Sequence, residues 1–196
     1  MSLVTILATE SFLSVMSDGR ITYSDEKVSR IVYEDYFKII HPSPNYFVAF
    51  TGDLTAIETF NKTSGILSPD EDQKSFASKI HKRLLDYTQG EVYVNYAIGG
   101  KNCNNEIEFF IFSSYSDAVE HSKPNNKNNM KFKALVSENI EIEDFAQEVS
   151  DLLNEIDEYT PQNAVQVQET ITRLVSSIDP TVNDNTHYII IKKYSR

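Results

Sequence analysis

The sequence predicts an α+β fold arranged as a four-layer α/β/β/α sandwich, with two stacked sheets between two pairs of helices. The main observation is the order of elements along the chain: several strands, two helices, three strands, two helices and one strand. Each of two stacked sheets has one outer face left to cover, and a pair of helices suits that face. No internal repeat or interdomain linker is visible, so residues 1–196 are expected to form one domain. A plain mixed α+β sandwich without this topology is the alternative.

Two pairs of strands are predicted in the N-terminal third. Residues 3–8 and 12–16 are rich in β-forming residues and are separated by a short polar turn. Residues 36–41 and 46–51 repeat this pattern around the proline-containing turn at 42–45. Each pair is expected to form an antiparallel hairpin.

Two helices are predicted next. After Gly52 the apolar residues Leu54, Ile57 and Phe60 recur at helical spacing. A longer helix is expected to begin at Ser68, which is followed by a proline and two acidic residues in the pattern of a capped N-terminus. Its apolar stripe comprises Phe76, Ala77, Ile80, Leu84 and Tyr87.

Three strands follow. Residues 92–98 and 107–113 are expected to pair through a turn at Gly99-Gly100, and residues 130–136 form a further strand after a polar loop.

The C-terminal part is predicted to hold two helices and a last strand. One helix has its apolar face between Phe145 and Ile156, and the next opens with the Thr160-Pro161 cap. Residues 187–191 then form the final strand.

The composition excludes several classes of partner. A formal net charge of −11 argues against nucleic acid and anionic membranes, because Lys and Arg must neutralise phosphates in such complexes. No apolar run approaches the ~20 residues of a membrane-spanning helix. Cys103 is the only cysteine, so an internal disulfide is excluded. The first residues lack a basic leader, and a cytoplasmic location is expected.

The sequence lacks the usual motifs of metal and nucleotide chemistry. The four histidines are isolated, without HExxH or paired-cysteine spacing. No GxGxxG, P-loop or GxSxG elbow occurs. Neither a cofactor nor a metal is therefore expected.

Five residues stand in a series of short motifs. Ser2 begins the first strand, and an Asp-x-Arg motif begins at Asp18, sixteen positions later. Lys38 lies in an apolar strand, Gly52 ends a strand just before a helix, and Asp179 follows the last helix. This series, with the order of elements, resembles the proteasome β-subunit and its simpler bacterial relative, the peptidase of the two-component ATP-dependent protease. The resemblance extends over nearly the whole chain.

The resemblance implies an N-terminal-nucleophile hydrolase that cleaves peptide or amide bonds. Ser2, exposed by removal of the initiator methionine, would supply the nucleophilic hydroxyl and, through its α-amine, the base. Lys38 would lower the proton affinity of the hydroxyl, with Asp18 holding Lys38 in place. Gly52 would donate its backbone N–H to the oxyanion, and Asp179 would orient the amine. A homo-oligomer, ring-like as in the family, is the expected assembly, and an ATPase partner is undetermined.

Two departures and several alternatives accompany this hypothesis. The chain has Val182 where the family often has a serine, and residues 135–138 replace a Gly-Ser-Gly turn, leaving Ser137 as a weak substitute. Lys27 is the less favoured candidate for the lysine. Each candidate also has an ordinary structural interpretation as a turn, surface or joint residue. A non-catalytic assembly protein, or a small-molecule acylase on the same fold, are the other functions considered.

Overall fold

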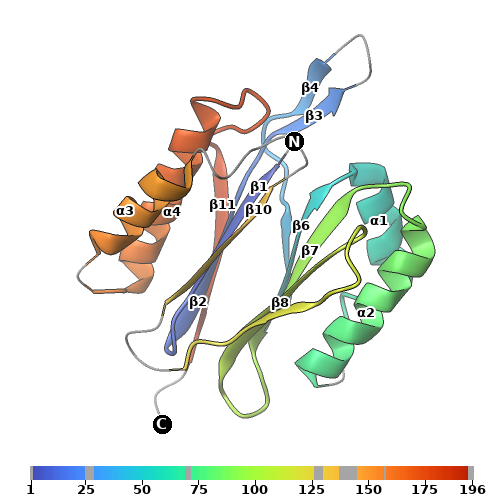
Figure 1. The fold of residues 1–196 in the computed structure, drawn as a ribbon, viewed down its shortest axis with the longest axis horizontal. Helices are drawn as coiled ribbons and strands as arrows, with labels where there is room; N and C mark the ends of the chain where they lie inside the picture. The colour runs from blue at the N-terminus through green and yellow to red at the C-terminus, as the bar shows by residue number, and fades with distance from the viewer. Residues whose placement is uncertain are drawn as a thin grey trace.

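A computed structural model describes residues 2–24, 29–68, 72–125, 130–136, 145–156 and 158–193. These residues form a mixed α/β fold with four helices and three antiparallel sheets. Figure 1 shows the two larger sheets facing each other, with α3 and α4 on one side and α1 and α2 on the other.

The N-terminal strands form the centre of a four-stranded sheet. β1 (Leu3–Ala8) pairs with β2 (Phe12–Asp18) on one side and with β10 (Lys131–Val136) on the other, and β2 also pairs with β11 (Thr186–Lys192). Every residue of β1 and β2 is buried. This pattern is typical of central strands whose sheet is covered on both faces.

The second large sheet has the order β5-β6-β7-β8-β9. Its strands are β5 (Ile39–Ser43), β6 (Tyr46–Gly52), β7 (Val94–Lys101), β8 (Ile107–Ser113) and β9 (Glu120–Ser122). All four pairings are antiparallel.

The helices cover the two sheets separately. α1 (Leu54–Thr63) and α2 (Gln73–Thr88) contribute to one apolar cluster with β6, β7 and β8. α3 (Ala146–Asn154) and α4 (Pro161–Ser176) contribute to two clusters with residues of β1, β2 and β10. A fourth cluster joins the sheets to each other through inward-facing residues such as Val15, Phe47 and Ala97.

A third, two-stranded sheet stands apart from the other two. β3 (Ile21–Ser24) and β4 (Ser29–Tyr33) form an antiparallel hairpin that extends beyond the ends of the large sheets (Figure 1). Neither this hairpin nor β9 was predicted from the sequence pattern.

Much of the predicted secondary structure is confirmed. β1 and β8 have the predicted bounds, and the two N-terminal hairpins are present as β1–β2 and β5–β6. The cap at Thr160 is also confirmed, because its hydroxyl accepts a hydrogen bond from the Asn163 N–H with Pro161 at the helix start.

The predicted turn at Gly99-Gly100 is wrong. Both glycines lie inside β7 and pair with β6 and β8. A Cβ on Gly99 would lie 2.5 Å from the Glu108 carbonyl oxygen, and one on Gly100 would lie 2.1 Å from that of Asn45. The glycines therefore permit close approach of neighbouring backbone, and the turn between β7 and β8 comes later, at residues 102–106.

Two predicted boundaries are also wrong. The longer helix is capped by Asp72, whose carboxylate accepts from the Ser75 N–H, and not by Ser68; residues 69–71 lie outside the described residues. The strand expected over 36–41 begins only at Ile39. No helix in the described ranges has the length and apolar character needed to cross a membrane.

Candidate active site

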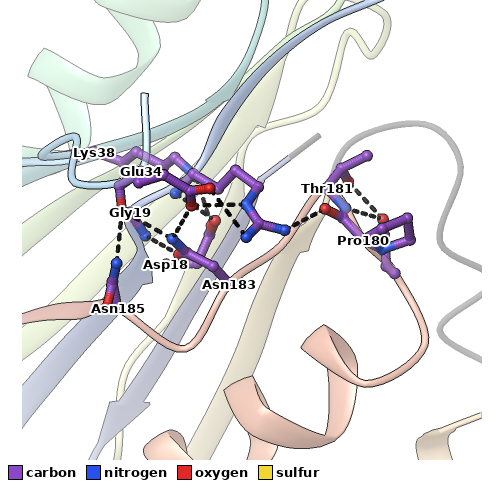
Figure 2. Close-up of polar contacts among 10 residues, drawn as sticks. Asp18, Gly19, Glu34, Lys38, Pro180, Thr181, Asn183 and Asn185 are labelled. Atoms are coloured by element: carbon purple, nitrogen blue, oxygen red, sulfur yellow. Dashed lines mark hydrogen bonds and ion pairs between the residues drawn. The ribbon is translucent and has the colours of Figure 1, made fainter. Parts of the chain in front are cut away.

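The centre of the candidate site is a buried ion pair between Asp18 and Lys38. Asp18 is the last residue of β2, and Lys38 immediately precedes β5, so the pair joins the two large sheets. The Lys38 Nζ lies 2.5 Å from Asp18 Oδ1, and the two side chains are 1% and 0% exposed. Figure 2 shows the lysine pointing toward the carboxylate. The predicted partnership of these residues is thus present in the structure.

Asp18 also binds backbone next to the chain start. Its Oδ1 accepts a hydrogen bond from the Leu3 N–H at 2.8 Å, and its Oδ2 accepts one from the Arg20 N–H at 3.0 Å. The Leu3 nitrogen belongs to the peptide bond that joins Ser2 to Leu3. The carboxylate that holds Lys38 therefore also fixes the backbone beside the candidate nucleophile.

Burial alters the acid–base behaviour of Lys38. Removal from water lowers the pKa of the Lys38 ammonium, and the negative charge of Asp18 opposes this change. A lysine whose pKa is lowered by burial beside a carboxylate is one mark of a functional site.

Ser2 is 4% exposed and lies directly before β1. It is thus held against the protein rather than extended into solvent. Its carbonyl belongs to the same peptide bond as the Leu3 N–H that donates to Asp18.

Gly52 ends β6 in a conformation that strongly favours glycine. Its φ is +116°, and a Cβ built there would lie 2.2 Å from the Tyr93 carbonyl oxygen. The next residue, Asp53, donates its N–H to that oxygen at 3.0 Å and caps α1 by accepting from the Ala56 N–H. Gly52 therefore makes a tight strand-to-helix joint.

Asp179 lies in the turn after α4. Its Oδ1 accepts hydrogen bonds from the Thr181 N–H at 2.8 Å and the Thr181 hydroxyl at 2.6 Å. Its Oδ2 is buried and has no hydrogen-bond partner within the described residues. One oxygen of Asp179 thus stabilises the turn, and the other is available for a further donor.

A polar network that the sequence analysis did not identify surrounds the ion pair (Figure 2). Asn183 accepts a hydrogen bond from the Gly19 N–H at 3.0 Å and donates to the Glu34 carbonyl and carboxylate at 2.8 and 2.9 Å. Arg20 pairs with Glu34 and donates to the carbonyl of Pro180. The network ties the turn after Asp18, the segment leading to Lys38, and the loop between α4 and β11 to one another.

The remaining sequence candidates have different outcomes. Lys27 and Ser137 lie outside the described residues. Val182 is 1% exposed and packs in an apolar cluster with Leu3, Ile171 and Val175. The hydroxyl that contacts Asp179 comes instead from Thr181, one residue earlier.

Comparison with solved structures identifies the fold. The chain resembles HslV from Trypanosoma brucei with a TM-score of 0.64 and 10% identity, covering 97% of this chain and 99% of that one. It resembles Anbu, an ancestral β-subunit, from Yersinia bercovieri with a TM-score of 0.72 and 10% identity, covering 97% and 81%. A Gly-1 mutant of Anbu from Hyphomicrobium sp. strain MC1 gives 0.70 and 11%, covering 98% and 82%. The chain has the fold of a proteasome-like β-subunit. No family model matches the sequence, and no curated protein matches it.

At 10–11% identity the proteasome-like similarity establishes the fold and leaves the chemistry to the residues of this chain. Within the described residues no group of three or more His, Cys, Asp or Glu side chains is placed to hold a metal ion. The arrangement that remains is a serine at the start of a strand, beside a buried lysine–aspartate pair.

Proposed function

We propose that this chain is a four-layer sandwich of the N-terminal-nucleophile type and hydrolyses peptide or amide bonds with Ser2 as nucleophile. The observation that carries the proposal is the double role of Asp18 Oδ1, which holds the Lys38 ammonium and the Leu3 N–H together. A buried ion pair is costly to desolvate, so its placement beside the chain start calls for a functional reason.

The proposed reaction begins once methionine removal has exposed the α-amine of Ser2. That amine, with an ordinary pKa of about 7.7–8.0, accepts the hydroxyl proton as Oγ bonds to the substrate carbonyl carbon. The carbonyl π electrons move to oxygen, where the Gly52 N–H stabilises the negative charge. The Lys38 charge favours both the neutral amine and the developing alkoxide.

The tetrahedral intermediate then collapses. The carbon–nitrogen bond breaks, and the leaving amine takes the proton held by the Ser2 ammonium, leaving an ester on Oγ. A water molecule then bonds to the ester carbonyl carbon as the α-amine takes its proton; the carbon–Oγ bond breaks, Oγ regains that proton from the ammonium, and the carboxylic acid product leaves. Asp179 would orient the Ser2 ammonium through its unpaired Oδ2.

Peptide hydrolysis by the processed protein tests the proposal. Protein lacking the initiator methionine, confirmed by intact mass, is assayed with a set of short fluorogenic peptides. We expect turnover that Ser2→Ala abolishes and Ser2→Thr retains in part, because threonine keeps the hydroxyl. Equal turnover by the processed protein and Ser2→Ala would rule out the assignment.

One observation favours a second function, a non-catalytic proteasome-like assembly protein. The position where the family often has a serine is occupied by buried Val182, so one polar group of the expected site is replaced by apolar packing. In that case the methionine would remain attached in natively expressed protein, and intact mass would show it. Loss of one methionine favours the enzyme.

The acidic surface and the fold together suggest the setting in which the protein works. We propose that the protein forms a homo-oligomer in the cytoplasm. A ring-like arrangement of its subunits stays a prediction, and an ATPase partner is undetermined. The net charge of −11 supports partners other than nucleic acid or anionic lipid.

A further inference from the structure

The β3–β4 hairpin exposes a concentration of large apolar side chains. Half of the large hydrophobic residues that are exposed within the described residues fall between positions 23 and 37. The exposed fractions are 50% for Tyr23 and Ile31, 46% for Val32, 51% for Tyr33 and 63% for Phe37. Three consecutive residues of β4 are half exposed, so neither face of this strand is covered. An isolated two-stranded hairpin of this kind is marginally stable in water.

β4 also has an edge without a strand partner in the described part of the chain. Its backbone pairs with β3, and the larger sheets do not continue past it. The hydrogen bonds just after β4, to the Glu34 carbonyl from Asn183 and Asn185, lie at the base of the hairpin beside Gly19. An exposed strand edge with apolar side chains is a template for pairing with another strand.

The sequence of β4 is complementary to itself when it is read in the opposite direction. In an antiparallel pair of two β4 strands centred on Val32, Ile31 of one copy faces Tyr33 of the other. Arg30 likewise faces Glu34, the residue just after β4, whose side chain is 49% exposed and also pairs with Arg20 of its own copy. Both are favourable cross-strand pairs, one β-branched with aromatic and one of opposite charge.

We infer that β4 pairs with β4 of a second copy of this chain, about a two-fold axis through Val32. The contact is isologous, because each copy presents the same strand to the other. It joins the two hairpins into a four-stranded sheet, which exceeds the minimum of three strands that a sheet needs for independent stability.

The chemistry of this surface favours a second copy as the occupant, and its area makes the contact a small one. The three half-exposed aromatic side chains and the smaller Ile31 and Val32 offer on the order of 400 Å² per copy, taking about half of a 150–250 Å² aromatic side chain as the upper unit. That is about half of the ~800 Å² that each partner buries in a standard interface. Tyrosine and arginine are enriched at protein interfaces, and Arg30 stacks over the Tyr23 ring at 5.4 Å within this surface.

Disulfide trapping tests the pairing and its register. In a Cys103→Ser background, the Val32→Cys variant places the two thiols at the two-fold axis, where opposed Cα atoms about 4.5–5.5 Å apart fall within disulfide range. Ile178→Cys in the same background is the control, since Ile178 is 60% exposed and lies outside the hairpin. We expect a covalent dimer from Val32→Cys under mild oxidation and monomer from the control.

Charge reversal provides the second arm. Arg30→Glu sets two carboxylates opposite each other, and we expect its dimer dissociation constant in sedimentation equilibrium to be at least tenfold weaker than that of the wild-type chain. The control Lys82→Glu makes the same change in charge on an exposed face of α2 and leaves the constant unchanged.

Circular dichroism of each variant verifies the fold. If Val32→Cys does not fold, the dissociation constant of Arg30→Glu decides whether β4 pairs with β4. A monomeric wild-type chain at high concentration overturns the inference, because another occupant must then cover the hairpin. Equal trapping by the control, or no effect of Arg30→Glu, overturns it as well. None of these readouts depends on catalysis.

Discussion

Replacing Lys38 with methionine removes the cation from a fully buried ion pair and keeps an unbranched side chain of similar length. The remaining Asp18 carboxylate is 0% exposed. Removing one partner of such a pair costs about 3–5 kcal/mol. Asp18 still accepts from the Leu3 and Arg20 N–H groups, so we expect the lower end of that range, about 3 kcal/mol.

The double variant Asp18→Asn/Lys38→Met separates the unpaired charge from lost packing. Asparagine keeps an oxygen for the Leu3 N–H but has no charge to leave buried. We expect the double variant to be less destabilised than the sum of the two single variants by about 0.5–3 kcal/mol, the range for residues in direct contact.

Urea unfolding at pH 7 and 25 °C measures these free energies. The control Lys82→Met removes an exposed lysine of α2, and we expect a change within about 0.5 kcal/mol. If Lys38→Met is no more destabilising than this control, or if the two single effects simply add, the ion pair does not have the energetic role assigned to it.

Three further expectations concern the surroundings of the pair. Gly52→Ala should destabilise the fold by about 1–3 kcal/mol and lower kcat. The control Gly90→Ala should cost less, because Gly90 also has positive φ but nothing lies within 4 Å of the new Cβ. Equal shifts of the melting temperature would contradict the close approach of Gly52 to Tyr93. Asn183→Leu should lower the free energy of unfolding in urea by about 1–3 kcal/mol, because it leaves the buried Gly19 N–H without its acceptor. Asn185→Leu, which loses one exposed hydrogen bond, is its control. Because burial lowers the pKa of Lys38, the unfolded chain binds this proton more tightly than the folded chain. The unfolding free energy of wild type minus that of Lys38→Met should therefore rise with pH from the lowered pKa up to the ordinary value of 10.5. A difference that falls as pH rises through this window would show that the pKa is shifted upward.

The elements predicted best were those defined by local patterns. β1 and β8 are mostly apolar runs bounded by polar turns, and the Thr160-Pro161 cap is a local signal for a helix start. β3 and β4 were missed because they are four and five residues long and face solvent, so they lack a buried face to produce a regular pattern. A turn was wrongly predicted at Gly99 and Gly100, because these glycines are required by the close approach of neighbouring strands and not by a turn.

The candidate site was predictable only in part. Asp18 and Lys38 were found because their motifs resemble those of a known fold, and composition or periodicity alone would not have paired them. Asn183 was missed because the groups it binds, at Gly19 and Glu34, lie 164 and 149 residues away along the chain. A lone asparagine in a loop gives no signal of such distant partners.

The central claim is that the hydroxyl of Ser2 becomes acylated. Processed protein is mixed with an activated p-nitrophenyl ester, quenched in acid within the first turnovers, digested and examined by mass spectrometry. We expect an acyl group on the peptide that begins at Ser2, removable by hydroxylamine as an ester and absent from Ser2→Ala. An adduct on any other peptide, or no adduct while the ester is still hydrolysed, would contradict it.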